Sequence, residues 1–206
     1  MNALALKSLL TLFVVVDPVG LAPIFLALAG SRPKAELTRI AGKSVLVASG
    51  LLAAFGVGGA RLLQRLGISL DAFKAAGGIL LFMIAVDMVL AKNERETEEE
   101  EEESLSRQDI SVFPLAIPMI AGPGALASLM ILATEAQATR FGLAVVLSMA
   151  GVVLAMGYLA LRAASLVARV LGQTGVNVVT RVLGVLLAAL AVQYVADGAR
   201  GLLLRP

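Results

Sequence analysis

An apolar run from Leu9 to Ala29 is interrupted by the sequence Asp17-Pro18-Val19-Gly20-Leu21-Ala22-Pro23. Two prolines five residues apart, with a glycine between them, disrupt an α-helix because proline lacks an N–H and its ring clashes with the preceding turn. The interruption also opens with a carboxylate. In the hydrocarbon core of a membrane, irregular backbone is tolerated only inside protein or beside a watery cavity, and an ionisable residue there indicates a functional site. The sequence therefore predicts a cavity near the membrane midplane.

The rest of the chain is composed almost entirely of similar apolar segments. Hydrophobic residues make up 59% of the sequence and the mean hydropathy is +0.91, which is typical of a polytopic membrane protein and not of a soluble domain. Segments of about 20 apolar residues are long enough to cross a bilayer as helices. We predict an all-α fold, a single membrane domain over residues 1–206, with six spans at about 4–29, 40–63, 72–91, 112–134, 141–161 and 178–203.

The second half of the sequence repeats the first. Pro118 and Pro123 flank a second proline–glycine motif with the same spacing as Pro18 and Pro23, at an offset of 100 residues. Further matches follow in order at slowly growing offsets. Gly50, Ala54, Gly56 and Arg61 match Gly151, Ala155, Gly157 and Arg162; Leu66-Gly67 matches Leu171-Gly172; the segment 78–87 matches 184–193. We therefore predict repeat one at about 4–91 and repeat two at about 112–203.

Three spans in each half have a geometric consequence. An odd number of crossings places the second repeat upside down relative to the first, as in the inverted repeats of many secondary transporters. The predicted fold is a 3+3 inverted repeat whose first and fourth helices are broken and meet near the midplane. An acidic linker at about 92–110 joins the repeats, and its six consecutive glutamates, Glu98 to Glu103, indicate a solvated segment.

Composition excludes several classes of function. The chain has no cysteine and no histidine, which excludes thiol chemistry, a histidine-based triad and the usual zinc ligands. Its serines have no base partner, so we predict that the protein is not an enzyme and binds no metal and no cofactor. The basic residues are scattered between apolar spans, which argues against nucleic acid as a partner.

The two breaks supply complementary backbone groups. The helix that follows a break presents unpaired N–H groups and a positive dipole end, which suit a carboxylate. The helix that ends at the first break presents carbonyls, and Asp17 adds a negative charge, which suits an ammonium group or a coupling ion. The predicted substrate-binding residues are Asp17, Pro18, Gly20, Leu21, Ala22, Pro23, Pro118, Ala121, Gly122, Pro123 and Gly124, with Asp17 also binding the coupling ion.

Each of these features also has a structural interpretation. Proline kinks in membrane helices are often packing devices, and Asp17 is equally suited to cap the helix that follows it. Asp87 lies five residues before Lys92, and it is placed either at the membrane interface or in the cavity. The small residues Gly50, Ala54 and Gly58 recur every four positions, which favours close helix packing either within the chain or between subunits of a homo-oligomer.

Four motifs resemble the MarC family of bacterial and archaeal membrane proteins, and the resemblance covers essentially the whole chain. They are Asp17-Pro18-x-Gly20-x-x-Pro23, the segment 76–81, the segment 114–125 from Pro114 to Ala125, and Ala191-Val192-Gln193-Tyr194-x-x-Asp197-Gly198. Some members of this family are described as neutral amino acid transporters, and the family looks related to amino acid and metal exporters of similar size. The resemblance therefore implies transport across a membrane and leaves the substrate open.

Taken together, the sequence favours a secondary transporter of small neutral amino acids such as glycine or alanine, coupled to protons or sodium. The alternatives are a cation or metal exporter of related fold, or a membrane protein without transport activity. We expect a multi-pass protein of the bacterial inner membrane or the archaeal plasma membrane, with the lipid bilayer as its surroundings. Of the 17 Lys and Arg residues, 10 lie on the side opposite the termini, so the positive-inside rule places both termini outside the cytoplasm.

Overall fold

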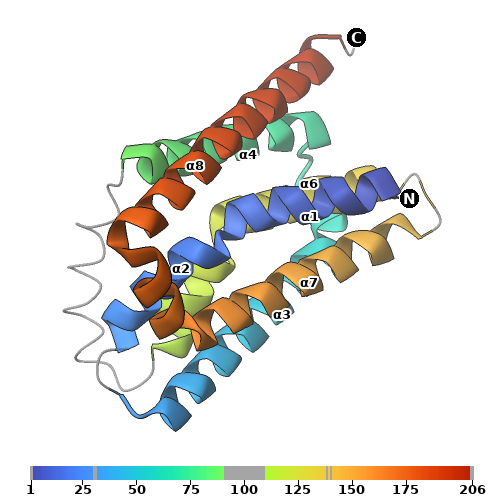
Figure 1. The fold of residues 1–206 in the computed structure, drawn as a ribbon. Helices are drawn as coiled ribbons and strands as arrows, with labels where there is room; N and C mark the ends of the chain where they lie inside the picture. Colours follow the sequence, from blue (N-terminus) through green and yellow to red (C-terminus); the bar gives the residue numbers. More distant parts are fainter. Residues whose placement is uncertain (1, 30–31, 91–109, 138, 140, 205–206) are drawn as a thin grey trace.

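The structure is a computed structural model, and it describes residues 2–29, 32–90, 110–137, 139 and 141–204. Every element within these ranges is helical (Figure 1). The predicted acidic linker falls almost wholly on residues 91–109, outside the described residues, and stays a prediction. The elements are α1 (Asn2–Val16), α2 (Pro18–Ala29), α3 (Lys34–Arg65), α4 (Leu70–Leu90), η1 (Ser111–Ile120), α6 (Pro123–Ala136), α7 (Gly142–Arg162) and α8 (Ala164–Leu204).

The lengths and composition of these helices confirm an all-helical polytopic membrane protein. Within the described residues, five segments are long and apolar enough to cross a membrane: α1 with α2, α3, α4, α7 and α8. A sixth span results when η1 and α6, which are bent by 54° at their junction, are counted together. The first and fourth spans are therefore the interrupted ones, as the two proline–glycine motifs predicted.

One expected boundary is wrong. The predicted spans 141–161 and 178–203 leave the segment 162–177 as a connection between them, but α8 begins at Ala164 and is helical through most of this segment. Its alanines, leucines and arginines are good helix formers, so the polar residues among them do not end the helix. The only interruption within α8 is Gly172, which has a φ of 60°.

Gly172 and Gly67 occupy matching positions of the sequence repeat, and both have a positive φ. Gly67 follows the end of α3 with a φ of 69°. Side chains other than glycine are strongly disfavoured at such angles, which explains why both positions are glycine. The sequence correspondence at this point therefore extends to the sign of φ.

Helices α4 and α8 lie along each other (Figure 1) and pack closely at glycines of both helices. A Cβ atom placed on Gly78 of α4 would lie 2.7 Å from the carbonyl oxygen of Ala191 and 2.8 Å from the backbone nitrogen of Val195 in α8. A Cβ atom placed on Gly184 of α8 would lie 3.2 Å from the carbonyl oxygen of Ala85 and 3.1 Å from a methyl group of Val89 in α4. Low residue numbers of one helix meet high numbers of the other, so the pair is antiparallel.

The small-residue stripe on α3 is not explained by packing within the chain. A Cβ atom added to Gly50 or to Gly58 would meet no atom within 4 Å among the described residues, and Gly50 and Ala54 are exposed. The interpretation as an intramolecular contact is therefore wrong for these two glycines. A homo-oligomer contact at this stripe stays a prediction.

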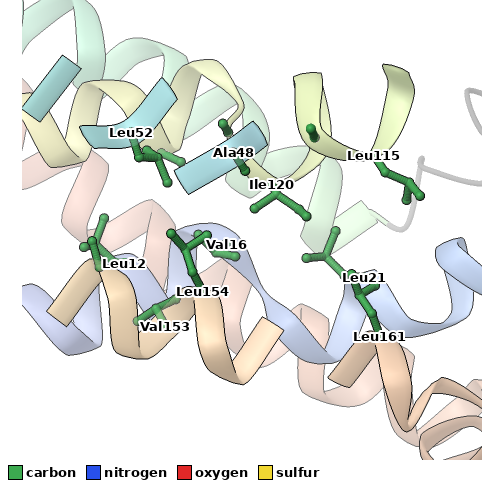
Figure 2. Close-up of a cluster of buried hydrophobic side chains, with 14 of the residues drawn as sticks. Leu12, Val16, Leu21, Ala48, Leu52, Leu115, Ile120, Val153, Leu154 and Leu161 are labelled. Atoms are coloured by element: carbon green, nitrogen blue, oxygen red, sulfur yellow. The ribbon is translucent and has the colours of Figure 1, made fainter. Parts of the chain in front are cut away.

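Two buried clusters hold the helices together. The larger cluster brings α1, α2, α3, η1, α6 and α7 into contact, and Figure 2 shows its residues Leu12, Val16, Leu21, Ala48, Leu52, Leu115, Ile120, Val153, Leu154 and Leu161. The smaller cluster joins α1, α4, α6 and α8 and contains Val14, Leu81, Ala85, Met88, Ile131, Leu187, Ala191 and Tyr194. Both clusters contain residues of both halves of the sequence, so the halves form one packed unit.

Candidate functional site

The first break is a single residue. Asp17 separates α1 from α2 with a φ of 44°, a left-handed conformation that Asp and Asn tolerate better than most residues. Pro18 is the first residue of α2, and Pro23 lies inside that helix. The break is therefore narrower than the seven-residue interruption that the sequence predicted, because a proline in the first turn of a helix needs no hydrogen-bond donor.

The backbone donors expected at this break are used within the chain. The Gly20 N–H donates to Oδ1 of Asp17 at 3.0 Å, and the Leu21 N–H donates to the Asp17 carbonyl at 3.1 Å. Ala22 lies one residue further into α2 and is fully buried in the larger cluster. This is the geometry of a helix N-cap, so the capping role considered for Asp17 is confirmed.

The second oxygen of the Asp17 carboxylate is held by the other half of the chain. The hydroxyl of Thr180 in α8 donates to Oδ2 of Asp17 at 3.0 Å, and Asp17 is only 8% exposed. A Cβ atom on Gly20 would overlap the Asp17 carboxylate, which explains the glycine at that position. Thr180 lies 163 residues from Asp17, and sequence reasoning did not single it out.

Replacing Asp17 with alanine should lower the free energy of unfolding by about 0.5–2 kcal/mol, because the cap and the Thr180 contact are both lost. Asp17→Asn should cost less, since its amide oxygen still accepts the Gly20 N–H. Ser69→Ala is the matched control, because Ser69 caps α4 through the Ala72 N–H at 3.1 Å. Thermal unfolding of the purified variants measures the difference. If Asp17→Ala costs no more than Ser69→Ala, the Thr180 contact contributes nothing.

The second break is wider and more open. Phe113 and Ile117 have extended backbone angles within η1, and the peptide bonds before Pro114 and Pro118 are cis. The Ala121 N–H donates back to the Ala116 carbonyl at 2.9 Å, so this predicted donor is already used. The break ends at Gly122, which is extended, and α6 begins at Pro123.

The start of α6 has no side-chain cap. Gly122 is the N-cap residue and has no side-chain oxygen to offer, whereas Asp17 supplies one at the start of α2. The N–H groups of Gly124 and Ala125 lie in the first turn of α6, where no preceding helical carbonyl accepts them. The positive end of the α6 dipole lies at the same place and favours an anionic group. The start of α6 is therefore a better anion-binding position than the start of α2.

A pocket of about 240 Å³ lies at this second break. One wall comes from the break and the start of α6, and the opposite elements are α1 and α4. Asp87 of α4 lines it and is partly buried, so the placement of Asp87 in the cavity, rather than only at the interface, is the one that the geometry supports. The lining residues are Val15, Ile84, Asp87, Met88, Pro118, Met119, Gly122, Pro123, Gly124 and Ala125.

The pocket brings together only some of the predicted site residues. Pro118, Gly122, Pro123 and Gly124 line it, whereas none of the predicted residues of the first break does. Repeat one contributes through Val15, two residues before Asp17, and through α4. Pro18, Leu21 and Ala22 are buried, and Leu21 and Ala22 lie in the larger cluster with Ile120 and Ala121 of the second break. A Cβ atom on Gly124 would lie 3.4 Å from Val15, so the second break lies against the end of α1, whereas Leu21 and Ala22 after the first break are buried in apolar surroundings.

Comparison with known sequences places this arrangement in a family. The sequence profile of the MarC family of integral membrane proteins matches residues 2–203. The chain belongs to the MarC family.

Curated members of the family are similar over nearly their full lengths. A UPF0056 membrane protein of Methanocaldococcus jannaschii is 39% identical over 197 residues, which cover 94% of this chain and 95% of the relative. The UPF0056 membrane protein YhcE of Escherichia coli is 34% identical, covering 95% and 92% of the two chains. YvbG of Bacillus subtilis is 36% identical, covering 94% and 92%. No solved structure matches this MarC-family protein.

Proposed function

We propose that this MarC-family protein is a secondary transporter of small neutral amino acids, such as glycine or alanine, and that the substrate binds in the pocket at the second break. The observation that carries this proposal is the pairing of an uncapped helix start with a carboxylate in one pocket. The α6 start offers N–H donors to the substrate carboxylate, and Asp87 offers its negative charge to the substrate ammonium group.

The rest of the pocket favours a small and uncharged side chain. Val15, Ile84 and Met88 provide apolar surface, and Gly122 and Gly124 add no side chain to the lining. A volume of about 240 Å³ is below the range of about 300–1,000 Å³ that is usual for pockets of drug-sized ligands. A glycine or alanine molecule fits these limits better than a large amino acid does.

We further propose that the two repeats have inverted topology. The contacts between α4 and α8 support this, because Gly78 meets Ala191 and Val195 while Gly184 meets Ala85 and Val89. The equivalent positions are Gly78 and Gly184, Ala85 and Ala191, and Val89 and Val195, and each pair is separated by 106 residues. The contacts of Gly78 with α8 therefore correspond to the contacts of Gly184 with α4. A two-fold axis produces such reciprocal contacts. For antiparallel helices that cross a membrane, the axis lies in the membrane plane, as in inverted-repeat transporters.

For energy coupling we propose a proton or a sodium ion. The sequence favours Asp17 as the coupling residue, although both of its carboxylate oxygens accept hydrogen bonds within the chain. Asp87 is the carboxylate that the pocket itself provides. A cation or metal exporter is the weaker alternative, because no group of three or more acidic, cysteine or histidine side chains comes together among the described residues.

Uptake into proteoliposomes tests the proposal. We expect labelled glycine or alanine to accumulate in vesicles that contain the purified protein when an inward proton or sodium gradient is imposed, and not in protein-free vesicles. Divalent cations, measured in parallel with an entrapped fluorescent indicator, should not enter. Accumulation of neither amino acid under either gradient, in either direction of transport, would overturn the assignment, and cation entry alone would favour the exporter.

A further inference from the structure

Three charged side chains connect three helices at one end of the bundle. Lys7 of α1 lies 2.8 Å from Oε2 of Glu135 in α6, and Lys74 of α4 lies 2.7 Å from Oε1 of the same carboxylate. The side chains of Lys74 and Glu135 are only 15% and 28% exposed, and that of Lys7 is 48% exposed. Each oxygen of one carboxylate therefore has its own lysine, from a different helix. We call this group the charged triad.

The same three helices form the pocket. Val15 of α1, Ile84 of α4 and Gly124 of α6 all line it. At a rise of about 1.5 Å per residue, the triad residues lie about 12–17 Å along each helix from these pocket residues. All three helices place the triad on the same side of the pocket. This is the end of the bundle at which α1 begins and α8 ends, because Lys7 is in the second turn of α1 and Gly201 of α8 lies against Asp71, three residues before Lys74.

The smaller buried cluster fills the space between the pocket and the triad. A Cβ atom on Gly124 would lie 3.0 Å from Leu81 and 2.9 Å from Ile84, so this layer begins directly at the pocket. Leu81 and Ile131 are fully buried, and they lie between the pocket and triad positions on α4 and α6. Tyr194 of α8 belongs to the same cluster and is 3% exposed.

On α4, the pocket residues lie near the end of the helix that is opposite to Lys74. Asp87 is within one helical turn of Leu90, the last residue of α4, whereas Lys74 is in the second turn of the same helix. A substrate in the pocket is therefore separated from the termini side by an apolar layer and then by two ion pairs. Access from that side requires α1, α4 and α6 to separate, and this separation breaks both ion pairs.

We propose that Lys7, Glu135 and Lys74 form a gate that keeps the pocket closed toward the membrane face bearing the termini. The assignment of the gate to a transport pathway rests on the proposed function, but the closure itself does not. Ion pairs suit such a gate because partly exposed pairs are individually weak and can open and reform, whereas the apolar layer excludes water while they are closed. Alternating access then needs this gate to open while the other side closes.

The absence of cysteine from the chain allows a direct test of closure. A single cysteine is introduced by Met119→Cys in the pocket, and its reaction with a membrane-impermeant methanethiosulfonate is followed from each face of oriented vesicles. Asn2→Cys marks the face that carries the termini. In the otherwise unchanged protein, the pocket cysteine should react slowly from the termini face. Adding Glu135→Gln should increase that rate by about tenfold, because both ion pairs are lost while the side-chain shape is kept.

Two further variants make the result specific to the triad. Glu36→Gln removes an ion pair with Arg32, 3.4 Å long, at the start of α3, and should leave the rate unchanged. Exchanging the charges with Lys7→Glu, Lys74→Glu and Glu135→Lys should restore a slow rate. If Glu135→Gln elutes as an aggregate, Lys7→Gln removes the more exposed lysine and should give a smaller increase in the same direction.

The outcomes separate the gate from the transport proposal. An unchanged rate in well-folded Glu135→Gln and Lys7→Gln overturns the gate, even if glycine uptake is measured. An increased rate without uptake of any amino acid supports the closure and overturns the transport assignment instead. An equal increase in Glu36→Gln would show general loosening of the bundle and would also overturn the gate.

Discussion

Replacing Asp87 with asparagine should raise the KM for glycine uptake by about 10- to 100-fold, because the ammonium group of the substrate loses a charged partner. Asparagine keeps the size of the side chain, and Asp87 is partly exposed in α4, so abundance and thermal stability should change little. Concentration-dependent uptake in proteoliposomes, at equal protein content, measures the effect. A larger change in KM than in the maximal rate is expected, since the contact is present in the bound ground state.

Asp197→Asn is the control for this substitution. Asp197 is also a partly exposed aspartate, on α8, and its Oδ1 accepts a hydrogen bond from the Gln193 amide at 2.8 Å. It does not line the pocket. The KM of the Asp197→Asn variant for glycine uptake should equal that of the unchanged protein. Equal KM values in the two variants would show that the ammonium group binds elsewhere, and the site would then have to be sought at the first break.

The pocket cannot be tested by enlarging the glycines of the two breaks. A Cβ atom on Gly20 would overlap the carboxylate of Asp17, and one on Gly122 would overlap the carbonyl oxygen of Pro118. Valine at either position would disturb the local backbone before it filled any space. Loss of uptake in such variants would therefore report misfolding of a break, which is why a change at Asp87 is the more informative one.

The broad fold could be predicted because it depends on local properties of the sequence. Apolar segments long enough to span a bilayer must form helices there, since no water satisfies their backbone groups. The proline–glycine motifs predicted the interruptions of the first and the fourth span. The boundaries of α3, α4 and α7 lie within a few residues of the prediction at most ends, and α8 was the exception because its polar beginning is still helical.

The site was predicted only in part, because its geometry depends on contacts between distant residues. The sequence could not show that Asp17 is held by Thr180, nor that Leu21 and Ala22 after the first break are buried in the larger cluster. It could not decide between two placements of Asp87, since a position near a helix end does not say which way a side chain points. The one available signal was that Asp87 lies within the repeated segment 78–87, where its counterpart is Gln193.

The largest loss of stability is expected from side chains introduced between α4 and α8. Gly78→Val would bring a methyl-bearing carbon against backbone atoms of Ala191 and Val195, which cannot move without displacing α8. The valine side chain of Gly184→Val would overlap sterically with Met88, Val89 and the carbonyl oxygen of Ala85. Overpacking of this kind should lower the free energy of unfolding by about 1–3 kcal/mol in each case.

Gly151→Val separates this steric effect from the general effect of a larger residue in a membrane helix. Gly151 lies in α7, is exposed, and would have no described atom within 4 Å of an added Cβ. The unfolding temperature of the Gly151→Val variant, followed by size-exclusion chromatography after heating in detergent, should stay near that of the unchanged protein. Because Gly78 and Gly184 lie in one interface, the double variant should lose less than the sum of the single losses. Comparable losses at these two repeat-related positions would fit a reciprocal contact, whereas full stability in both variants would contradict the close approach of α4 and α8 on which the proposed two-fold relation depends.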